Sequence, residues 1–412
     1  MALIVQKFGG TSVGSTDRIK NVATKVKKEL DKGNQVVVVV SAMSGETNKL
    51  VAFAEELNPL TSNEALAEYD VIVSTGEQVT IGLLALALQN SGIKAKSMIS
   101  WQCPILTDEN HSKARIEDID GERILKEVNS GYVVIIPGFQ GVTIAENPLD
   151  RKITTLGRGG SDTSAVAIAA ALKADRCDIY TDVDGVYTSD PRIVPKARKL
   201  NKIGYEEVLE MASLGAKVLH SRCVELAMVY KVRTQVLSSF DDVEGTYLVE
   251  EEEVMERRVV TGVTYSKNDA QITLKGVENT PGIAGKIFTP LAEAGISVDM
   301  IVQNVGKDAK KADLTFTIAK TDIAKTEEIL SKIGIKFDSI YKDDTVVKIS
   351  LIGVGMRSHA GIAAKMFEVL ASKGVNIHVI ATSEIKISVL VDEEYLELAM
   401  RSLHTAFGLD KK

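Results

Sequence analysis

The last third of the chain carries the same sequence pattern twice, and this repeat limits the possible fold more than any other feature of the sequence. The segment PGIAGKIFTPLAEAG at Pro281 matches AGIAAKMFEVLASKG at Ala360, with Gly282 and Gly361 in register at a spacing of 79 residues. The strands before them, LKGV and LIGV, repeat as well. Each copy reads as strand, glycine-containing loop, helix and strand, so we expect two homologous α+β units at the end of the chain.

The first 245 residues follow a different pattern, in which short β-branched runs alternate with helical periodicity. This alternation indicates an α/β layer structure with a mostly parallel sheet. The run Val36–Val40 is apolar on both faces, as a strand covered by helices on both sides should be. A charge-dense stretch, DDVEGTYLVEEEEVMERR, follows at Asp241. We therefore expect a first domain over residues 1–245, a linker over 246–264, and α+β units over 265–342 and 343–412.

The composition excludes several classes of protein. The chain of 412 residues has a net charge of −7, whereas partners such as nucleic acid or anionic membrane require concentrated basic surface. No apolar run approaches the roughly 20 residues that span a bilayer, and the first residues look like a strand and not a signal peptide. The cysteines, Cys103, Cys177 and Cys223, form no CxxC pair or zinc spacing. A reduced, cytoplasmic setting is the simplest expectation.

The glycine-rich stretch after the first predicted strand suits a phosphate group. Lys7 stands directly before Phe8, Gly9 and Gly10. Glycine N–H groups can approach phosphate oxygens without a Cβ clash, while the lysine balances charge on a phosphoryl group. The lysine precedes the glycines, so the stretch is not a P-loop. A plain glycine turn after an edge strand explains the same residues equally well.

Three other stretches also suit anionic ligands. In LGRGGSD a helix follows the glycines, so its free N–H groups and the guanidinium of Arg158 suit phosphate or carboxylate, although Asp162 could simply cap the helix. The loop TDVDGVYTSDPR at Thr181 follows a strand, where open α/β sheets bind ligands, but could be an ordinary turn. In STGE, Glu77 could complement a helix dipole or anchor an amine.

Taken in order, KFGGTS, SAMSGETN, STGEQV, GRGGSD, TDVDGVYTSDPR and the paired repeats closely resemble the aspartate kinases of the amino-acid kinase superfamily over essentially the whole chain. The resemblance implies an amino-acid-kinase-type, mostly parallel sheet sandwiched by helices, followed by two ferredoxin-like ACT domains. It implies ATP-dependent phosphorylation of the side-chain carboxylate of L-aspartate to 4-phospho-L-aspartate. This reaction is the first step towards lysine, threonine and methionine.

The resemblance also assigns roles to individual residues. Lys7 and Asp162 are implied to be catalytic, with Asp162 orienting Lys7. The substrate would be bound by Ser41, Thr47, Glu77 and Arg158, with Arg158 taking the α-carboxylate and Glu77 the amino group. The nucleotide would be bound by Lys7, Gly9, Gly10, Thr181, Asp182, Tyr187, Arg192, Lys217 and Val218. ATP would enter as a substrate with Mg²⁺ held mostly by phosphates and water, so neither a protein metal ligand nor a tightly bound cofactor is expected.

The ACT-like repeats imply regulation by an amino acid, with lysine, threonine or both as inhibitors. The loop around Pro281 opens a helix whose free N–H groups can receive an effector carboxylate. The candidate effector residues are Asn279, Ala284, Ser297, Val298, Asp299 and Gln303 in the first unit, and Ala363, Ala364, Ile377, His378 and Glu384 in the second. The repeats would also join copies of the chain into a homo-oligomer, or bind a separate regulatory subunit made of the ACT region.

Three alternatives stay open at this point. The substrate could be glutamate, acetylglutamate or carbamate, although those relatives generally lack a paired ACT tail. The chain could be a non-catalytic amino-acid sensor, but such a protein is expected to have lost Lys7, Arg158 or Asp162, and all three are present. The repeats could serve only as an oligomerisation surface.

Overall fold

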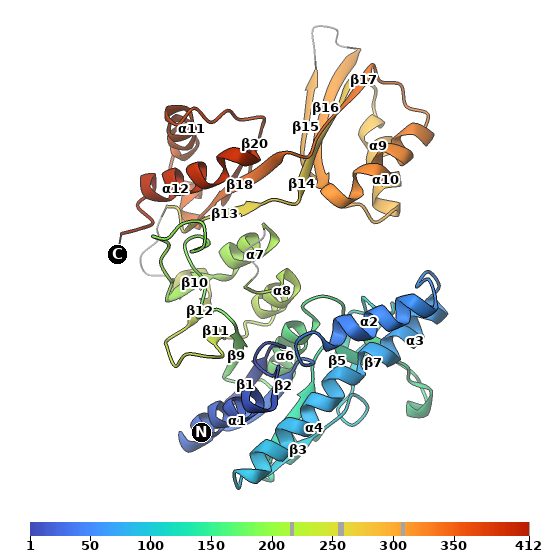
Figure 1. Ribbon diagram of the computed structural model, residues 1–412, viewed down its shortest axis with the longest axis vertical. Coiled ribbons are helices and arrows are strands. Elements are labelled where there is room, and N and C mark those ends of the chain that lie inside the picture. The colour runs from blue at the N-terminus through green and yellow to red at the C-terminus, as the bar shows by residue number, and fades with distance from the viewer. Residues whose placement is uncertain (215–217, 254–258, 306–309, 412) are drawn as a thin grey trace. The chain divides into compact units, whose positions relative to one another are not determined.

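The computed structural model describes residues 1–214, 218–253, 259–305 and 310–411, which form two compact units (Figure 1). The N-terminal unit comprises Met1–Val186, Lys199–Ser213 and the described residues from 218 to 253. The C-terminal unit comprises Tyr187–Arg198, Leu214 and the described residues from 259 onward. A short piece from the middle of the chain is therefore part of the C-terminal unit.

The N-terminal unit is built on an eight-stranded sheet in the order β10-β12-β11-β9-β1-β2-β6-β3. All neighbouring strands are parallel except β11 and β12. The strands are β1 (Leu3–Phe8), β2 (Gln35–Val40), β3 (Ala95–Ser97), β6 (Val133–Pro137), β9 (Arg176–Thr181), β10 (Lys202–Gly204), β11 (Thr234–Ser238) and β12 (Thr246–Val249). The expected mostly parallel sheet is confirmed.

Helices cover both faces of this sheet. Val36, Val38 and Val40 of β2 pack in one core cluster with residues of α1 (Thr16–Asp31) and α4 (Thr75–Asn90). Val37 and Val39 point to the opposite face, where α5 (Glu122–Asn129) and α6 (Gly160–Ala171) pack, and both are fully buried. The apolar run is therefore a central strand, as its composition predicts.

The N-terminal unit also contains a smaller sheet. Its order is β5-β4-β7-β8, from β4 (Ile105–Thr107), β5 (Ile116–Ile119), β7 (Gln140–Thr143) and β8 (Ile153–Thr155). The other helices are α2 (Glu46–Leu57), α3 (Asn63–Val73), α7 (Tyr205–Ser213), α8 (Ser221–Val229) and the 3₁₀ turns η1 (Pro148–Asp150) and η2 (Glu251–Glu253). Helix α3 packs against β8, and α6 packs against α8.

One helical stretch, Asn63–Asn90, is long and apolar enough to cross a membrane, with a mean hydropathy of 1.7, although no such run was expected from the sequence. Half of the apolar 18-residue window within this stretch is buried inside the protein, as is usual for a core helix. The stretch also includes the buried carboxylates of Asp70 and Glu77.

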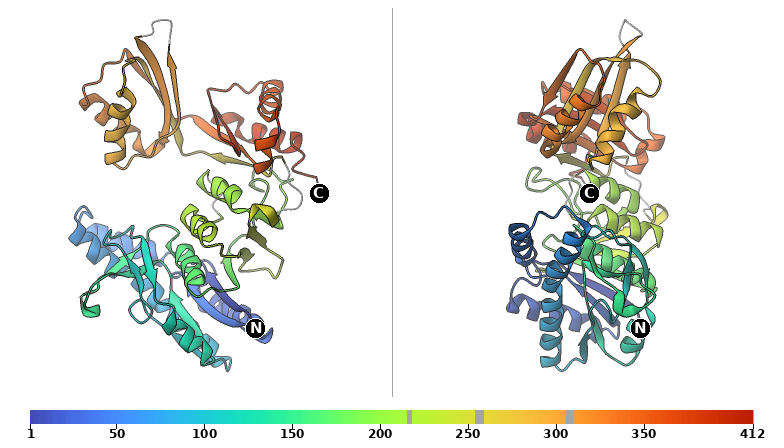
Figure 2. Two further views of the ribbon diagram at one scale, coloured as in Figure 1. Left: turned by 180° about the vertical axis from the view of Figure 1, so that it is seen from behind. Right: turned by 90° about the vertical axis from the view of Figure 1, so that its right-hand side faces the viewer.

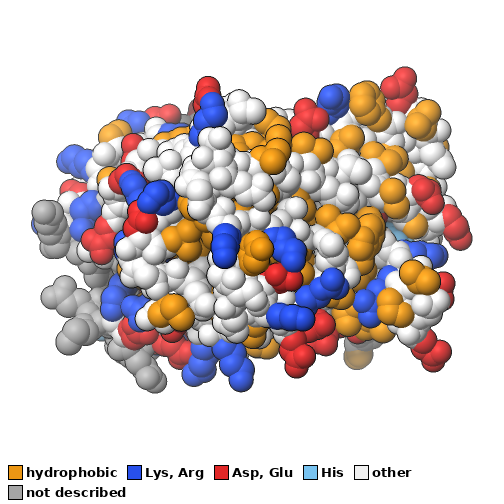
Figure 3. Space-filling view, turned by 90° about the horizontal axis from the view of Figure 1, so that it is seen from below, with side chains coloured by type: hydrophobic (Ala, Val, Ile, Leu, Met, Phe, Trp, Pro, Cys, Tyr) orange, Lys and Arg blue, Asp and Glu red, His pale blue; other side chains and the backbone are white. Residues whose placement is uncertain are grey.

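On the face drawn in Figure 3, basic side chains are interspersed with acidic and apolar ones and form no continuous basic field.

The C-terminal unit contains two four-stranded sheets, each with two helices on one face (Figures 1 and 2). The first sheet, β15-β16-β14-β17, is formed by β14 (Asp269–Glu278), β15 (Asp299–Val305), β16 (Lys311–Ala319) and β17 (Ser339–Asp343), with α9 (Ile283–Glu293), η3 (Lys320–Asp322) and α10 (Ile323–Lys332). Its chain order, βαββαβ, and its strand order are those of a ferredoxin-like fold. The first of the two expected ACT-like domains is therefore confirmed.

The second sheet takes its edge strand from upstream. Its order is β13-β18-β20-β19, from β13 (Gly262–Ser266), β18 (Val346–Ile352), β19 (Val379–Thr382) and β20 (Lys386–Asp392), with η4 (Val354–Ser358), α11 (Ile362–Ser372), η5 (Glu393–Tyr395) and α12 (Leu396–Ala406). Strand β13 pairs antiparallel with β18, with Gly262 opposite Ile352. It occupies the place that β17 occupies in the first sheet, so the first ACT domain is inserted between β13 and the rest of the second.

The segment Tyr187–Arg198 completes the core of the second ACT domain. Val194 is 2% exposed and belongs to the same cluster as the side chains of α11 and α12. The hydroxyl of Thr188 lies 2.9 Å from Nε2 of His404, and Arg198 donates to the carbonyl of Leu409. This segment is therefore part of the folded C-terminal unit and not a surface loop of the N-terminal one.

Leu403→Ala tests this core. Leu403 in α12 is fully buried, so the change should lower the free energy of unfolding of the C-terminal unit by about 2–5 kcal/mol. The control is Leu398→Ala in the same helix, where the side chain is 42% exposed and the cost should be below about 1 kcal/mol. Urea unfolding followed by circular dichroism measures both, and equal costs would contradict the assigned core.

Candidate active site

Three parallel strands end side by side and bring their following loops together. β1 lies between β9 and β2, with Phe8 aligned with both Tyr180 and Val40. Immediately after the strands, Gly9 N donates to Tyr180 O at 3.3 Å, and Ser41 N donates to Phe8 O at 3.0 Å. The lysine-glycine loop, the loop at Ser41 and the loop after β9 therefore share the carboxyl edge of the sheet, where open α/β sheets bind ligands.

An ion pair connects the two glycine-rich stretches. The ammonium of Lys7, at the end of β1, lies 2.5 Å from Oδ1 of Asp162, and the two side chains are only 9% and 15% exposed. Asp162 is in the first turn of α6, whose N-cap is Gly159. Its carboxylate thus pairs with Lys7 instead of capping the helix. The pair holds a cation beside two runs of backbone N–H groups, which suits a phosphoryl group.

A buried carboxylate lies at the start of α4. Glu77 is 2% exposed, and its Oε1 accepts a hydrogen bond from Ala42 N at 3.0 Å, whereas Oε2 has no hydrogen-bond partner in the described part of the chain. Burial raises the pKa of this carboxyl to about 7, against the lowering effect of the Ala42 N–H group. An unpartnered buried oxygen of this kind is suited to a cationic ligand.

Two glycines allow this close approach. A Cβ on Gly76 would lie 2.7 Å from the Cβ of Ala42, and a Cβ on Gly10 would lie 3.0 Å from the carbonyl oxygen of Ala42. Any larger residue would push the start of α4 or the first glycine loop away from the loop that follows β2. The glycines in KFGGTS and STGE therefore position Lys7 and Glu77 around one backbone segment.

Ser239 also belongs to this edge, although no sequence motif singles it out. Its Oγ lies 2.5 Å from Oγ of Ser12, and its N–H donates to Thr181 O at 2.8 Å. Both serines are buried. Ser239 thus fastens the first glycine loop to the end of β9. The contact joins distant parts of the chain, so spacing could not reveal it.

Five other predicted substrate- and nucleotide-binding residues make few side-chain hydrogen bonds or ion pairs within the described part of the chain. Arg158 is exposed, and no ion-pair or hydrogen-bond partner is found for its side chain among the residues that are described. Thr47 is half-buried in the first turn of α2, and Thr181 donates from its hydroxyl to exposed Asp182 at 3.1 Å. Val218 is half-buried in a turn before α8.

Three of the predicted nucleotide-binding residues lie outside the described part of the N-terminal unit. Lys217 lies outside the described residues. Tyr187 and Arg192 belong to the C-terminal unit, where the guanidinium of Arg192 forms hydrogen bonds with both carboxylate oxygens of Asp190. Their role in binding a nucleotide stays a prediction.

Two of the effector candidates in the first ACT domain lie in contact, since Gln303 donates to the side-chain oxygen of Asn279 at 3.3 Å. Ala284 is half-buried in the first turn of α9. Ser297 is exposed and Val298 half-buried just before β15. The carboxylate of Asp299 accepts a hydrogen bond from Lys348, a buried lysine of β18 that also pairs with Asp269. Asp299 is therefore already paired with a lysine.

The corresponding candidates in the second ACT domain are partly engaged. His378 Nε2 lies 2.7 Å from a carboxylate oxygen of Asp392, and Glu384 pairs with Arg357 at 3.3 Å. Ala363 and Ile377 are half-buried, and Ala364 is exposed on α11. The two domains therefore share a fold while their candidate effector residues differ in charge pairing.

A cavity of about 370 Å³ lies elsewhere in the N-terminal unit, between α1 and the strands β9, β11 and β12. Its charged side chains largely pair with one another: Arg176 with Asp178, and Lys25 with Asp242. None of the predicted site residues lines it. The residues at the carboxyl edge are therefore the better candidate site.

Comparisons with known proteins agree with this geometry. The model of the amino acid kinase family matches residues 2–238, and two ACT domain models match residues 271–335 and 349–407. The chain is 54% identical to "Aspartate kinase Ask_LysC" of Stutzerimonas stutzeri over 413 residues, which cover 100% of this chain and 98% of that one. It is equally similar to the aspartokinase of Pseudomonas aeruginosa, at 54% identity over 414 residues and the same coverage.

The chain belongs to the aspartate kinase family. Solved structures in this family share its fold. Escherichia coli aspartokinase III in complex with aspartate and ADP, described as the R-state, superimposes with a TM-score of 0.80 at 28% identity, covering 98% of this chain and 99% of that one. The same enzyme in complex with lysine and aspartate, described as the T-state, gives 0.77 at 27% identity with the same coverage. This aspartate kinase is thus a phosphotransferase with two ACT domains.

Glu77→Gln tests the electrostatics of the buried carboxyl. A folded-state pKa of about 7, raised from 4.5, means that its favourable contribution to stability is present below about pH 4.5 and lost as the pH rises through 7. The variant cannot ionise, so its advantage over the wild type should grow from near zero at pH 4.5 to about 3 kcal/mol at pH 8.

Urea unfolding of both proteins at several pH values measures this difference. Glu56→Gln, at an exposed position on α2, is the control and should show no such growth. A Glu77→Gln difference that is constant with pH would contradict a raised pKa.

Proposed function

We propose that this kinase transfers the γ-phosphoryl group of ATP, bound with Mg²⁺, to the side-chain carboxylate of L-aspartate, giving 4-phospho-L-aspartate and ADP. The product would enter the pathway to lysine, threonine and methionine. The observation that carries the choice of substrate is the buried Glu77, whose free oxygen is suited to an ammonium group. Relatives with 54% identity along the whole chain are aspartate kinases, which supports the same choice.

The chemistry follows from the charges involved. The side-chain carboxyl of aspartate has a pKa of about 3.9, so at neutral pH it is already a nucleophile and requires no general base. A carboxylate oxygen forms a bond to the γ-phosphorus while the bond from that phosphorus to the ADP oxygen breaks. The difficulty is that two anions must meet, and preorganised cations and N–H groups lower that barrier.

The site residues divide this task between two ends of the substrate. Lys7, held by Asp162, would balance charge on the transferred phosphoryl group, with Gly9 and Gly10 contributing N–H groups. Arg158, exposed and free to form a bidentate pair, would take the α-carboxylate. Glu77 would take the ammonium group. Mg²⁺ would supply further neutralisation of the phosphates and would be held mostly by them and by water.

The other predicted contacts complete the proposed sites. Ser41 and Thr47, at the loop after β2 and the start of α2, would seat the substrate side chain. The nucleotide would lie over the end of β9, contacting Thr181 and Asp182, with Tyr187, Arg192, Lys217 and Val218 as further contacts. These assignments rest on the family motifs in this sequence.

Lys7→Ala tests the catalytic assignment. With ATP, Mg²⁺ and L-aspartate, hydroxylamine traps an acyl phosphate as a hydroxamate, and the variant should lose at least about a hundredfold in kcat. Lys20→Ala, which removes a lysine that is 72% exposed on α1, is the matched control and should keep wild-type turnover. Hydroxamate formed from another acid but not from aspartate would overturn the substrate, and an active Lys7→Ala enzyme would overturn the role of Lys7.

We further propose that lysine, threonine or both inhibit the enzyme through the ACT domains. E. coli aspartokinase III, which shares this domain order, has been crystallised with lysine and aspartate. In this chain the contact between Asn279 and Gln303 forms a polar pair beside the start of α9. An inhibitor must bind more tightly to a state with a less active kinase domain, since only differential affinity shifts such an equilibrium.

Gln303→Ala tests the effector site. Losing hydrogen bonds to a charged ligand should raise the inhibitory concentration of the effector by about ten- to a hundredfold without changing uninhibited turnover. Asn304→Ala, on the next exposed position of β15, is the control. Assays with lysine, threonine and both amino acids identify the effector, and equal responses of the two variants would contradict the proposed site.

A further inference from the structure

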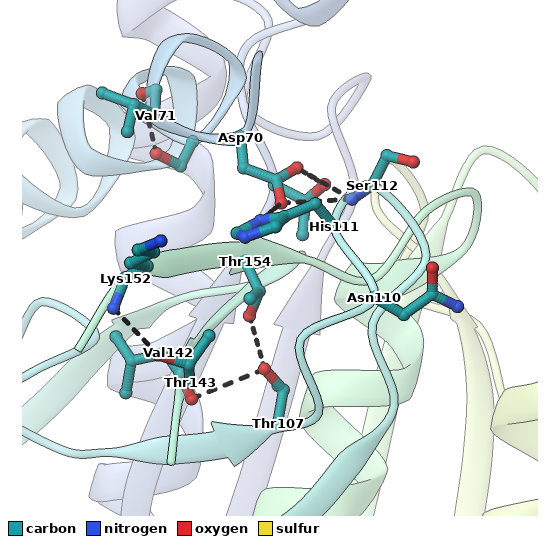
Figure 4. A network of polar contacts seen from close by, with 12 residues as sticks. Asp70, Val71, Thr107, Asn110, His111, Ser112, Val142, Thr143, Lys152 and Thr154 are labelled. Carbon is teal, nitrogen blue, oxygen red and sulfur yellow. Dashed lines mark hydrogen bonds and ion pairs between the residues drawn. The ribbon is translucent and has the colours of Figure 1, made fainter. Parts of the chain in front are cut away.

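A fully buried carboxylate on α3 is hydrogen-bonded to three residues, two from one loop and one from a strand of the N-terminal unit. Asp70 is 0% exposed, and its Oδ2 lies 2.7 Å from Nδ1 of His111. The N–H group of Ser112 donates to both carboxylate oxygens at 3.1 Å, and the hydroxyl of Thr155 donates to Oδ1 at 2.5 Å. Figure 4 shows Asp70, His111 and Ser112 converging from the helix and from the loop between β4 and β5.

On one side, this carboxylate is connected to Glu77 through the junction of α3 and α4 at Ser74. Ser74 N donates to Asp70 O at 3.1 Å, so the helical path continues from α3 into α4. Glu77 follows Asp70 by seven residues, which is close to two helical turns and places both side chains on the same face. The backbone therefore links the position of Asp70 to that of Glu77.

On the other side, the carboxylate is connected to Arg158. Thr155 is the last residue of β8, and the next carbonyl, that of Leu156, accepts a hydrogen bond from Arg222 at 2.8 Å. Gly157 then turns the backbone with φ of +75°, and Arg158 follows. Gly157 alone separates Arg158 from Thr155 and Leu156, which are both held by hydrogen bonds. These two residues therefore determine the position of the Arg158 backbone.

We propose that Asp70, acting through Thr155, is a positioning residue that sets the spacing between Glu77 and Arg158. The inference rests on the proposed function, in which these two groups bind the ammonium and the α-carboxylate of one aspartate molecule. Both charged groups of an amino acid are carried by one carbon atom, so their two partners must stand at a fixed separation. Directional hydrogen bonds to a buried carboxylate fix such a separation better than apolar packing, which tolerates small shifts.

Burial supports this interpretation. Placing a carboxylate where no water reaches it is costly, and desolvation raises the pKa of Asp70 despite hydrogen bonds that lower it. A well-packed apolar side chain would give comparable stability without this cost. A position that keeps a buried carboxylate between two ligand-binding elements therefore favours a geometric role.

The decisive variant is Thr155→Val, which keeps the volume and removes the donor to Asp70. The KM for aspartate should rise about ten- to a hundredfold, while the KM for ATP and kcat change less than about threefold. Thr155→Ser, which restores a hydroxyl, should return the KM for aspartate to within about threefold of the wild type. Asp70→Asn, which keeps the shape of the acceptor and loses its charge, should also raise the KM for aspartate.

The matched control is Thr107→Val in the same small sheet. Its hydroxyl is equally buried and lies 2.7 Å from that of Thr154 (Figure 4). Among the described residues, its other hydrogen bonds go to the carbonyls of Asp108 and Val142, and none goes to Asp70. It should destabilise the protein to a similar degree and leave the KM for aspartate unchanged. If Thr155→Val and Thr107→Val raise that KM equally, Asp70 and Thr155 are merely structural and the inference is wrong.

A double-mutant cycle with Arg158→Lys gives an independent answer. If Thr155 acts by placing Arg158, its effect on kcat/KM for aspartate should shrink to less than about threefold in the Arg158→Lys background. Full additivity would overturn the inference. Failure of the proposed function looks different, because the wild type would then form no hydroxamate from aspartate, or Arg158→Lys alone would leave the KM for aspartate unchanged.

Discussion

The ion pair between Lys7 and Asp162 joins the end of the central strand β1 to the start of α6, and the candidate site is arranged around it. Breaking a buried pair of this kind costs about 3–5 kcal/mol because an uncompensated charge is left behind. The pair therefore fixes a cation where two glycine-rich loops meet. In the sheet, β1 lies between β9 and β2, so the loops that follow these three strands share one edge.

A second, opposite charge completes this arrangement. Glu77 accepts a hydrogen bond from the backbone N–H of Ala42 in the loop after β2. The same Ala42 lies close to Gly10 and Gly76. The same edge thus offers a positive group at the end of β1 and, at the start of α4, a carboxyl group with a pKa of about 7. A neutral protein surface would attract neither phosphate nor ammonium selectively, whereas this arrangement can orient a molecule that carries both.

The sequence predicted what depends on local pattern. The valine run gave a central strand because its period and composition fit burial on both faces, and the repeated glycine, helix and strand gave two ACT domains. The sequence alone could not decide whether Asp162 caps a helix or pairs with a cation, because its partner Lys7 is far away in the chain. Asp70 and Ser239 carry no motif at all, since each is one polar residue whose contacts come from distant strands. The pairing of β13 with β18 could not be predicted for the same reason. The repeat shows which segments resemble each other, but it does not show that a strand before the first repeat belongs to the sheet of the second.

The path of the chain through residues 187–198 has a consequence for how the molecule can be divided. Val194 fills part of the core of the second ACT domain. Lys199, just after the segment, forms an ion pair with Asp184, just before it, and both of these residues belong to the N-terminal unit. A single cut after residue 253 would therefore produce two pieces that cannot both be whole. The C-terminal piece would lack a wall of its own core, and the N-terminal piece would carry that wall as an exposed apolar arm. The segment 187–198 on the N-terminal fragment would still fit the incomplete core of the C-terminal fragment, so we expect the two fragments to bind each other.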